Sequence, residues 1–173
     1  LIKVKVSGDL DNDLEALQEI DRVLPGDVQI FLDGNQGFSK ESVIVFLRRL
    51  DQHNIRPPLF FEQPLPKDQW TELKELRQSI ETPVCLDESV TTASDAMRAA
   101  KEQTAPLINL KFMKSGVRET LKITKIAAQH GIELMIGGMV ESEITMNASL
   151  AFFCRSGLIK YADLDTPFFI KEF

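Results

Sequence analysis

The sequence predicts an α/β fold in which parallel strands alternate with helices, as in a (β/α) TIM-type barrel or an open doubly wound sheet. Short apolar runs alternate with longer runs whose apolar residues recur at helical spacing. The strand candidates are mostly apolar on both faces, as expected where helices cover both sides of a parallel sheet. No strand is followed by the glycine-rich fingerprint of a dinucleotide or P-loop site, which weakens nucleotide-binding interpretations.

Seven runs are predicted as strands: residues 1–6, 28–32, 58–61, 84–86, 107–111, 133–137 and 158–162. A closed (β/α) barrel has eight strands, so the prediction is an apparently partial barrel with seven of them. No linker or low-complexity segment divides the chain. Residues 1–173 are therefore predicted to form one partial catalytic barrel domain.

Between these strands, helical patterns cover residues 40–52, 67–80, 93–103, 116–130 and 141–156. Ser39 is a good N-cap for the first of them. Thr92 and Asp95 resemble a capping box with Asp in place of Glu. Gly131 and Gly157 are natural residues to follow a helix C-terminus.

Composition narrows the function classes. The net charge of −6 and the lack of a basic cluster argue against nucleic-acid binding. No apolar run is long enough for a membrane span, and no signal peptide is visible. Cys85 and Cys154 each lie in an apolar stretch, which favours buried thiols in a reducing compartment. We therefore expect a cytoplasmic protein.

Acidic residues occur at the ends of three successive strands, one βα unit apart. Asp33 ends the second strand, Glu62 the third and Asp87 the fourth. Taken singly, each acid could be a helix cap or a turn residue. Together they would repel one another unless a cation were shared. All-oxygen ligands on separate strands suit Mg²⁺, with Mn²⁺ as an alternative.

Lysines are the candidates for acid–base work, because neither histidine lies near a strand end. Lys5 lies on the strand before the acids and Lys111 on the strand after them. Lys3 is placed to lower the pKa of Lys5, which would make Lys5 a usable general base. Alternatively, Lys3 and Lys5 could form the solvent face of a strand, and Lys111 could extend to the surface. Lys114 is expected at the surface.

These residues resemble the enolase superfamily in its muconate-lactonizing subgroup. The matching motifs follow the family's order over almost the whole chain: "KVK" (3–5), "DGN" (33–35), "EQP" (62–64), "DES" (87–89) and "NLKFMKSG" (109–116). The resemblance implies Mg²⁺ held by Asp33, Glu62 and Asp87, with Asn35, Glu88 and Lys3 in supporting positions. It also implies Lys5 and Lys111 as acid–base catalysts on opposite faces of the substrate. They would remove a proton α to a carboxylate through an enediolate intermediate.

Within the subgroup, "DLDTP" (163–167) looks like the Asp-x-Asp motif of dipeptide epimerases of the Ala-Glu type. Asp163 and Asp165 would then bind the substrate's ammonium group. The expected function is a Mg²⁺-dependent dipeptide epimerase, an isomerase. The alternatives are a muconate-type cycloisomerase or an o-succinylbenzoate synthase, and, in another class, an inactive metal- or ligand-binding fragment.

Two of the family's parts are not found in this sequence, namely the N-terminal capping domain and the first barrel strand. Open strand edges carry unpaired backbone groups that can pair with another chain. We therefore expect the 173-residue chain alone to be inactive or nearly so, and prone to associate, for example as a homo-oligomer, or to aggregate. The simplest explanation is that it is part of a longer protein.

Overall fold

The computed structural model describes residues 1–165, which form seven strands and six helices in strict alternation. The chain divides into two compact units, Leu1–Cys85 and the part from Leu86 onward. Every pair of neighbouring strands whose register is resolved is parallel. The predicted βα alternation is confirmed within each unit.

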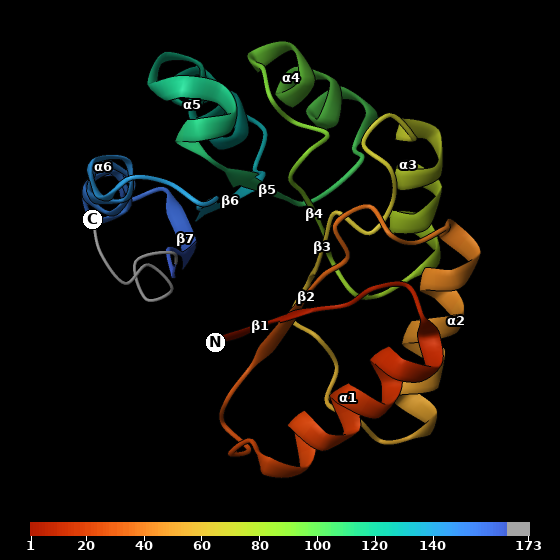
Figure 1. Ribbon diagram of the computed structural model, residues 1–173. Coiled ribbons are helices and arrows are strands. Elements are labelled where there is room, and N and C mark those ends of the chain that lie inside the picture. The colour runs from red at the N-terminus through yellow and green to blue at the C-terminus, as the bar shows by residue number, and fades with distance from the viewer. Residues whose placement is uncertain (166–173) are drawn as a thin grey trace. The chain divides into compact units, whose positions relative to one another are not determined.

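The first unit contains four strand segments in chain order and three helices (Figure 1): β1 (Ile2–Lys5), α1 (Leu10–Val23), β2 (Ile30–Asp33), α2 (Lys40–Gln52), β3 (Phe61–Glu62), α3 (Trp70–Ser79) and β4 (Val84–Leu86), whose last residue crosses the division. Figure 1 shows α1, α2 and α3 along one side of these strands. The core includes the stacked rings of Phe31 and Phe60, whose centroids lie 4.6 Å apart. All four residues of β2 are buried, as expected for a parallel strand covered on both faces.

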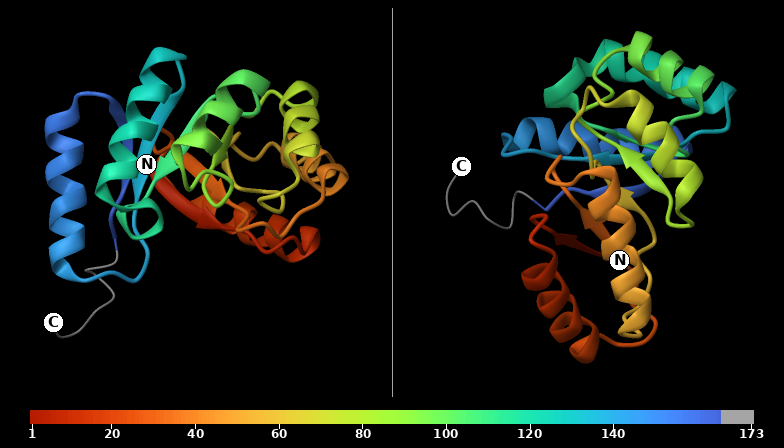
Figure 2. Two further views of the ribbon diagram at one scale, coloured as in Figure 1. Left: turned by 90° about the horizontal axis from the view of Figure 1, so that it is seen from above. Right: turned by 90° about the vertical axis from the view of Figure 1, so that its right-hand side faces the viewer.

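The second unit contains α4 (Ala93–Glu102), β5 (Leu107–Leu110), α5 (Phe112–Gln129), β6 (Glu133–Gly137), α6 (Glu143–Ser156) and β7 (Ile159–Asp163). Its three helices stand side by side in the left view of Figure 2. β5 is buried throughout, whereas β7 alternates between half-buried and exposed residues. β7 has a register shift beside Leu134 of β6.

Local sequence explains most of the helix boundaries. Ser39 caps α2, and Thr92 with Asp95 forms the predicted capping box of α4. α5 begins at Phe112, before the predicted start at residue 116, because a short helical turn precedes a kink at Gly116, where φ is 71°. α1 was not predicted, although Asp9 at its N-cap and the buried Leu14 and Leu17 on one face are ordinary helix signals.

The two cysteines differ from the expectation that both are buried. Cys85 is buried in β4, but Cys154 is exposed on α6, and both are free thiols. The apolar run around Cys154 cannot all face inward, because successive residues of a helix point in different directions. Some apolar side chains of this run are therefore left at the surface.

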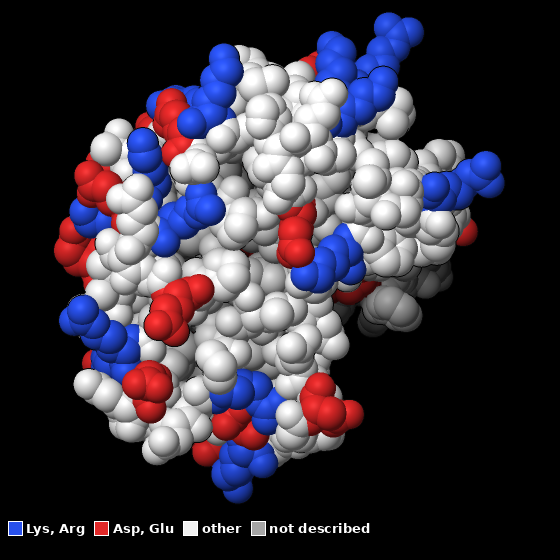
Figure 3. All heavy atoms as spheres, turned by 180° about the vertical axis from the view of Figure 1, so that it is seen from behind, with Lys and Arg blue, Asp and Glu red and all other residues white. Residues whose placement is uncertain are grey.

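Acidic and basic side chains are interspersed over the face seen in Figure 3, with no extended patch of one sign. Within residues 1–165, no helix combines the length and the apolar character that crossing a bilayer requires.

Candidate active site

The first unit places two predicted acids at neighbouring strand ends. Asp33 is the last residue of β2, Glu62 is the last residue of β3, and the two are register partners. Asp33 is 1% exposed and Glu62 is fully buried. Two buried carboxylates at such close range need a positive charge to offset their repulsion and their desolvation.

Lys3 supplies a positive charge to both acids. Its Nζ lies 3.0 Å from Oδ2 of Asp33 and 3.4 Å from Oε2 of Glu62. The Lys3 ammonium group also lies 5.7 Å from the centre of the Phe31 ring. Lys3 is therefore directed into the carboxylate pair, and its interpretation as a solvent-facing residue is wrong.

Lys5 shares Asp33 with Lys3 but remains accessible. Its Nζ lies 3.1 Å from Oδ2 of Asp33 and 2.5 Å from Oδ1 of Asn35, and its side chain is 67% exposed. The Asn35 backbone N–H in turn donates to Oδ1 of Asp33. This turn requires a glycine at position 34, because the Cβ of any other residue there would lie only 2.9 Å from Cα of Pro64. Lys5 is thus a cation held at the strand end and open to a ligand.

In the second unit, two lysines hold Asp87, which is 2% exposed. Lys111 donates to Oδ2 of Asp87, and Lys114 donates to Oδ1 at 2.8 Å. Burial raises the pKa of Asp87, but the charges of Lys114 and Lys111 outweigh it and hold that pKa below its ordinary value. Asp87 is therefore ionised in this network.

Lys114 does not lie at the surface, where the sequence analysis expected it. Its side chain is only 10% exposed, and its Nζ also donates to the backbone carbonyls of Asp87 and Asn109. Lys114 follows Lys111 by three residues, but both precede the predicted helix start at residue 116 and Lys111 is an extended N-cap residue, so helical spacing gave no signal for this contact.

Lys111 also depends on a glycine of the neighbouring strand. A Cβ at Gly137 would lie 3.1 Å from Cε of Lys111 and less than 3 Å from both amide atoms of Asn109. Both of these neighbours are buried. Because Gly137 of β6 has no side chain, the aliphatic part of Lys111, the residue after β5, can pack against it.

The remaining predicted residues lie at strand ends of the second unit. Asp163 ends β7 half-buried, opposite Gly137, and Asp165, two residues later, is exposed. Thr166 and Pro167 of the same motif lie outside the described residues. Glu88 follows Asp87 and is half-buried, and its Oε2 is buried without a hydrogen-bond partner. Its supporting role stays a prediction.

The chemistry of Asp33 and Glu62 fits a divalent cation. Their carboxylate oxygens are the ligands that Mg²⁺ prefers, and a lysine ammonium group already lies between them. Within residues 1–165, no group of three or more His, Cys, Asp or Glu side chains is arranged as a metal site. Instead, lysine ammonium groups contact the predicted ligands in each unit. Lys3 contacts Asp33 in the first unit, and Lys111 and Lys114 contact Asp87 in the second.

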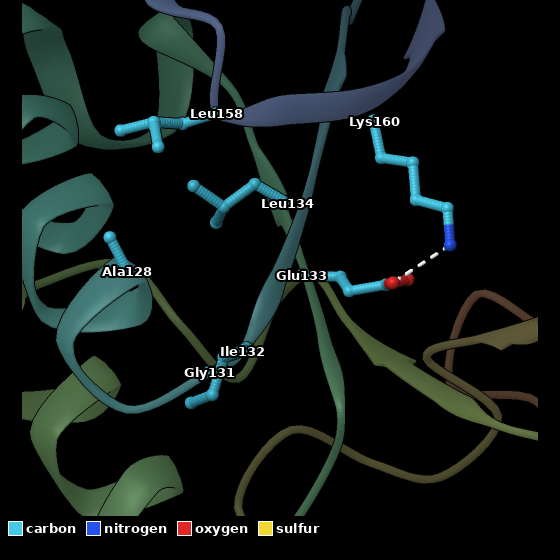
Figure 4. Close-up of a pocket in the computed structure, with 7 residues that line it drawn as sticks. All are labelled: Ala128, Gly131, Ile132, Glu133, Leu134, Leu158 and Lys160. Atoms are coloured by element: carbon cyan, nitrogen blue, oxygen red, sulfur yellow. Dashed lines mark hydrogen bonds and ion pairs between the residues drawn. The ribbon is translucent and has the colours of Figure 1, made fainter.

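A separate pocket of about 340 Å³ lies at the other ends of β6 and β7 (Figure 4). Apolar side chains line most of it, and Glu133 pairs with Lys160 at 2.7 Å. It opens beside the amino ends of these strands, whereas the functional groups of parallel barrels gather at the carboxyl ends. The pocket is therefore not part of the candidate active site.

The family model "Enolase C-terminal domain-like" matches residues 1–169. The chain belongs to this family. The resemblance to the enolase superfamily drawn from the strand-end motifs is thereby confirmed. The matched residues include both lysine–carboxylate clusters.

Known relatives refine this assignment. The chain is 42% identical over 172 residues to the hydrophobic dipeptide epimerase of Citrifermentans bemidjiense, covering 98% of this chain and 46% of that one. The crystal structure of a mandelate racemase/muconate lactonizing protein from Herpetosiphon aurantiacus matches with a TM-score of 0.93 at 40% identity, covering 99% of this chain and 48% of that one. The predicted likeness to dipeptide epimerases and the predicted fold class, a partial (β/α) barrel, are confirmed.

A second similar structure was solved with ligands. The dipeptide epimerase of Enterococcus faecalis complexed with Mg and the dipeptide L-Leu-L-Tyr matches with a TM-score of 0.93 at 30% identity. The match covers 98% of this enolase-family chain and 48% of the epimerase. The chain thus spans about half the length of the relatives that it matches.

Proposed function

We propose that the full-length protein carrying this chain is a Mg²⁺-dependent dipeptide epimerase. The observation that carries the proposal is the pairing of one lysine with one strand-end aspartate in each unit, Lys5 with Asp33 and Lys111 with Asp87. Relatives named as dipeptide epimerases, and one of them solved with Mg and a dipeptide, support it.

In this proposal, Asp33, Glu62 and Asp87 hold Mg²⁺. The first two are buried register partners, and Asp87, which is also buried, is the third proposed ligand. Bound there, the dication would stabilise the negative charge that develops on the substrate carboxylate when the α-proton leaves. The lysine ammonium groups that contact these acids in the structure would adjust to the dication.

Lys5 and Lys111 move the proton. One neutral lysine takes the proton from the α-carbon of one epimer, and the other lysine, protonated, returns a proton to the opposite face of the same carbon. The roles exchange for the other epimer. Lys3 contributes positive charge beside Asp33 and Glu62, and Asp33 is also the acid that Lys5 contacts.

Asp163 and Asp165 are proposed to bind the ammonium group of the dipeptide. Two carboxylates at strand ends attract a cation. The anionic substrates of a cycloisomerase or a succinylbenzoate synthase would gain nothing from them. The half-burial of Asp163 partly shields this interaction from water, whereas Asp165 is exposed.

The test is proton exchange at the α-carbon. The full-length protein is incubated with Mg²⁺ and a set of dipeptides in D₂O, and loss of the α-proton signal is followed by NMR. Dipeptides should exchange and epimerise, and chelation of the metal should stop both. Turnover of muconate or of a succinylbenzoate precursor, with no exchange from any dipeptide, would refute the proposal.

A further inference from the structure

Lys114 has a side chain that is only 10% exposed and an ammonium group with fixed partners. Its Nζ lies 2.6 Å from the carbonyl oxygen of Asp87, 2.8 Å from Oδ1 of Asp87 and 2.9 Å from the carbonyl oxygen of Asn109. A lysine has three N–H donors, so these three bonds use all of them. Two of the partners are backbone atoms, which cannot turn away. Lys114 therefore ties the end of β4 to the end of β5.

The two oxygens of Asp87 are divided between two lysines. Oδ1 accepts from Lys114, and Oδ2 accepts from Lys111. An aspartate carboxylate can otherwise rotate and exchange its two oxygens, because its terminal torsion is broad and two-fold. Lys114 holds Oδ1 of Asp87 and is itself held by the backbone carbonyls of Asp87 and Asn109. Oδ2 is therefore the carboxylate oxygen that can change partners.

The backbone couples the two lysines. The N–H groups of Lys114 and Ser115 both donate to the carbonyl of Lys111 at 3.1 Å, which closes a single helical turn. The kink at Gly116 then separates this turn from the rest of α5. Lys114 is thus placed relative to Lys111 by a local turn, independently of the remainder of the helix.

Electrostatics alone would argue against a lysine here. A positive charge next to a metal-binding carboxylate repels a dication and weakens its binding. Keeping Lys114 buried at this position therefore requires a benefit that exceeds the repulsion. Orientation of the carboxylate is such a benefit, because residues that orient a metal ligand typically change metal affinity by about 10–100-fold when removed.

We propose that Lys114 is a positioning residue that holds Oδ1 of Asp87, so that Oδ2 alone is presented to Mg²⁺ and to Lys111. The inference deepens the proposed function and rests on it. It differs from a purely structural tie between β4 and β5, which would change stability without changing metal affinity.

The experiment measures Mg²⁺ affinity by isothermal titration calorimetry on the full-length protein, below the melting temperature of every variant. Lys114→Met removes the charge and all donors, and Lys114→Gln removes the charge but keeps an N–H donor. Lys125→Met is the matched control, because Lys125 is exposed on the same helix. Circular dichroism reports whether each variant keeps its helix content.

Both Lys114 variants should bind Mg²⁺ about tenfold or more weakly than the wild type, although loss of a positive charge alone would strengthen binding. The Lys125→Met control should bind as the wild type does. If the wild type itself binds no Mg²⁺, the proposed function fails. If the wild type binds and the Lys114 variants bind as well or better, or if unfolding is their only effect, Lys114 is a structural tie and the inference is wrong.

Discussion

Asp33 and Glu62 are register partners at the ends of β2 and β3, and both carboxylates are in contact with the ammonium group of Lys3. The pair is almost completely buried, so its repulsion is screened little by water. Lys3 offsets that repulsion with one positive charge. A dication brings two charges to oxygen ligands of the type it prefers, which makes this pair the centre of the metal proposal.

Mg²⁺ should therefore raise the melting temperature of the full-length protein. A ligand that binds only the native state stabilises it, by about 2.7 kcal/mol at a concentration of one hundred times Kd. Asp33→Asn should remove most of this shift. Asp51→Asn, at an exposed position of α2, is the control and should keep it. Differential scanning calorimetry with and without Mg²⁺ makes the comparison, and an unchanged wild-type melting temperature would count against the site.

The two lysines should act on different epimers. Lys111→Ala should slow α-proton exchange from one stereoisomer by about 10²–10⁴-fold and leave measurable exchange from the other, and Lys5→Ala should do the reverse. The measurement is NMR in D₂O with each pure epimer. Epimerase activity retained by both single variants would show that the two-base assignment is mistaken.

Asp163 and Asp165 should matter only for substrates with a free ammonium group. Replacing both by Asn should raise KM for dipeptides and leave the N-acetylated analogues almost unaffected. The size of the change reports solvent access, because an exposed charge pair contributes only about 0–1 kcal/mol. Steady-state kinetics with matched substrate pairs test this. An equal loss for both substrate types would point to a general structural effect instead.

Gly137→Ala should displace the Lys111 side chain without changing the charge of any residue. The added methyl group would lie 3.1 Å from Cε of Lys111 and closer still to Asn109, so both buried side chains must shift. We expect a loss of about 1–3 kcal/mol in stability and about tenfold or more in kcat. Gly26→Ala is the control, since a Cβ there meets no atom within 4 Å. Wild-type kcat in the Gly137→Ala variant would contradict the tight fit.

The capping box of α4 gives a pH-dependent prediction. Burial raises the pKa of Asp95, but hydrogen bonds from the Thr92 and Thr91 side chains and N–H groups outweigh it and lower that pKa below its ordinary value of 3.8. Its contribution is therefore present above pH 3.8 and lost as pH falls through the folded-state pKa. Asp95→Asn should cost about 1 kcal/mol near neutral pH.

Urea unfolding of the wild type and Asp95→Asn across acidic pH measures this difference. The gap in the free energy of unfolding should narrow as pH falls below 3.8. Asp68→Asn, at an exposed position before α3, should show no comparable gap. A gap that stayed constant with pH would mean that the carboxylate charge of Asp95 does not contribute.

The sequence by itself determined the order of the strands and of every helix except α1, and the strand-end positions of the site residues. α2 occupies the predicted residues 40–52, because Ser39 and the spacing of its apolar residues are local signals. Asp33 and Glu62 were placed at equivalent heights because successive parallel strands of one sheet end at the same edge. Such features depend on chain order and on short-range periodicity, which a sequence carries directly.

Tertiary structure decided which side chains contact one another. Lys114 was expected in solvent, but the turn before Gly116 directs it to Asp87 and to the carbonyl of Asn109. Lys3 was expected to influence Lys5, yet its direct contacts are with Asp33 and Glu62. Long lysine side chains have many rotamers of similar energy, so their direction is fixed by partners on other strands. The positions of those partners become known only once the strands have been packed.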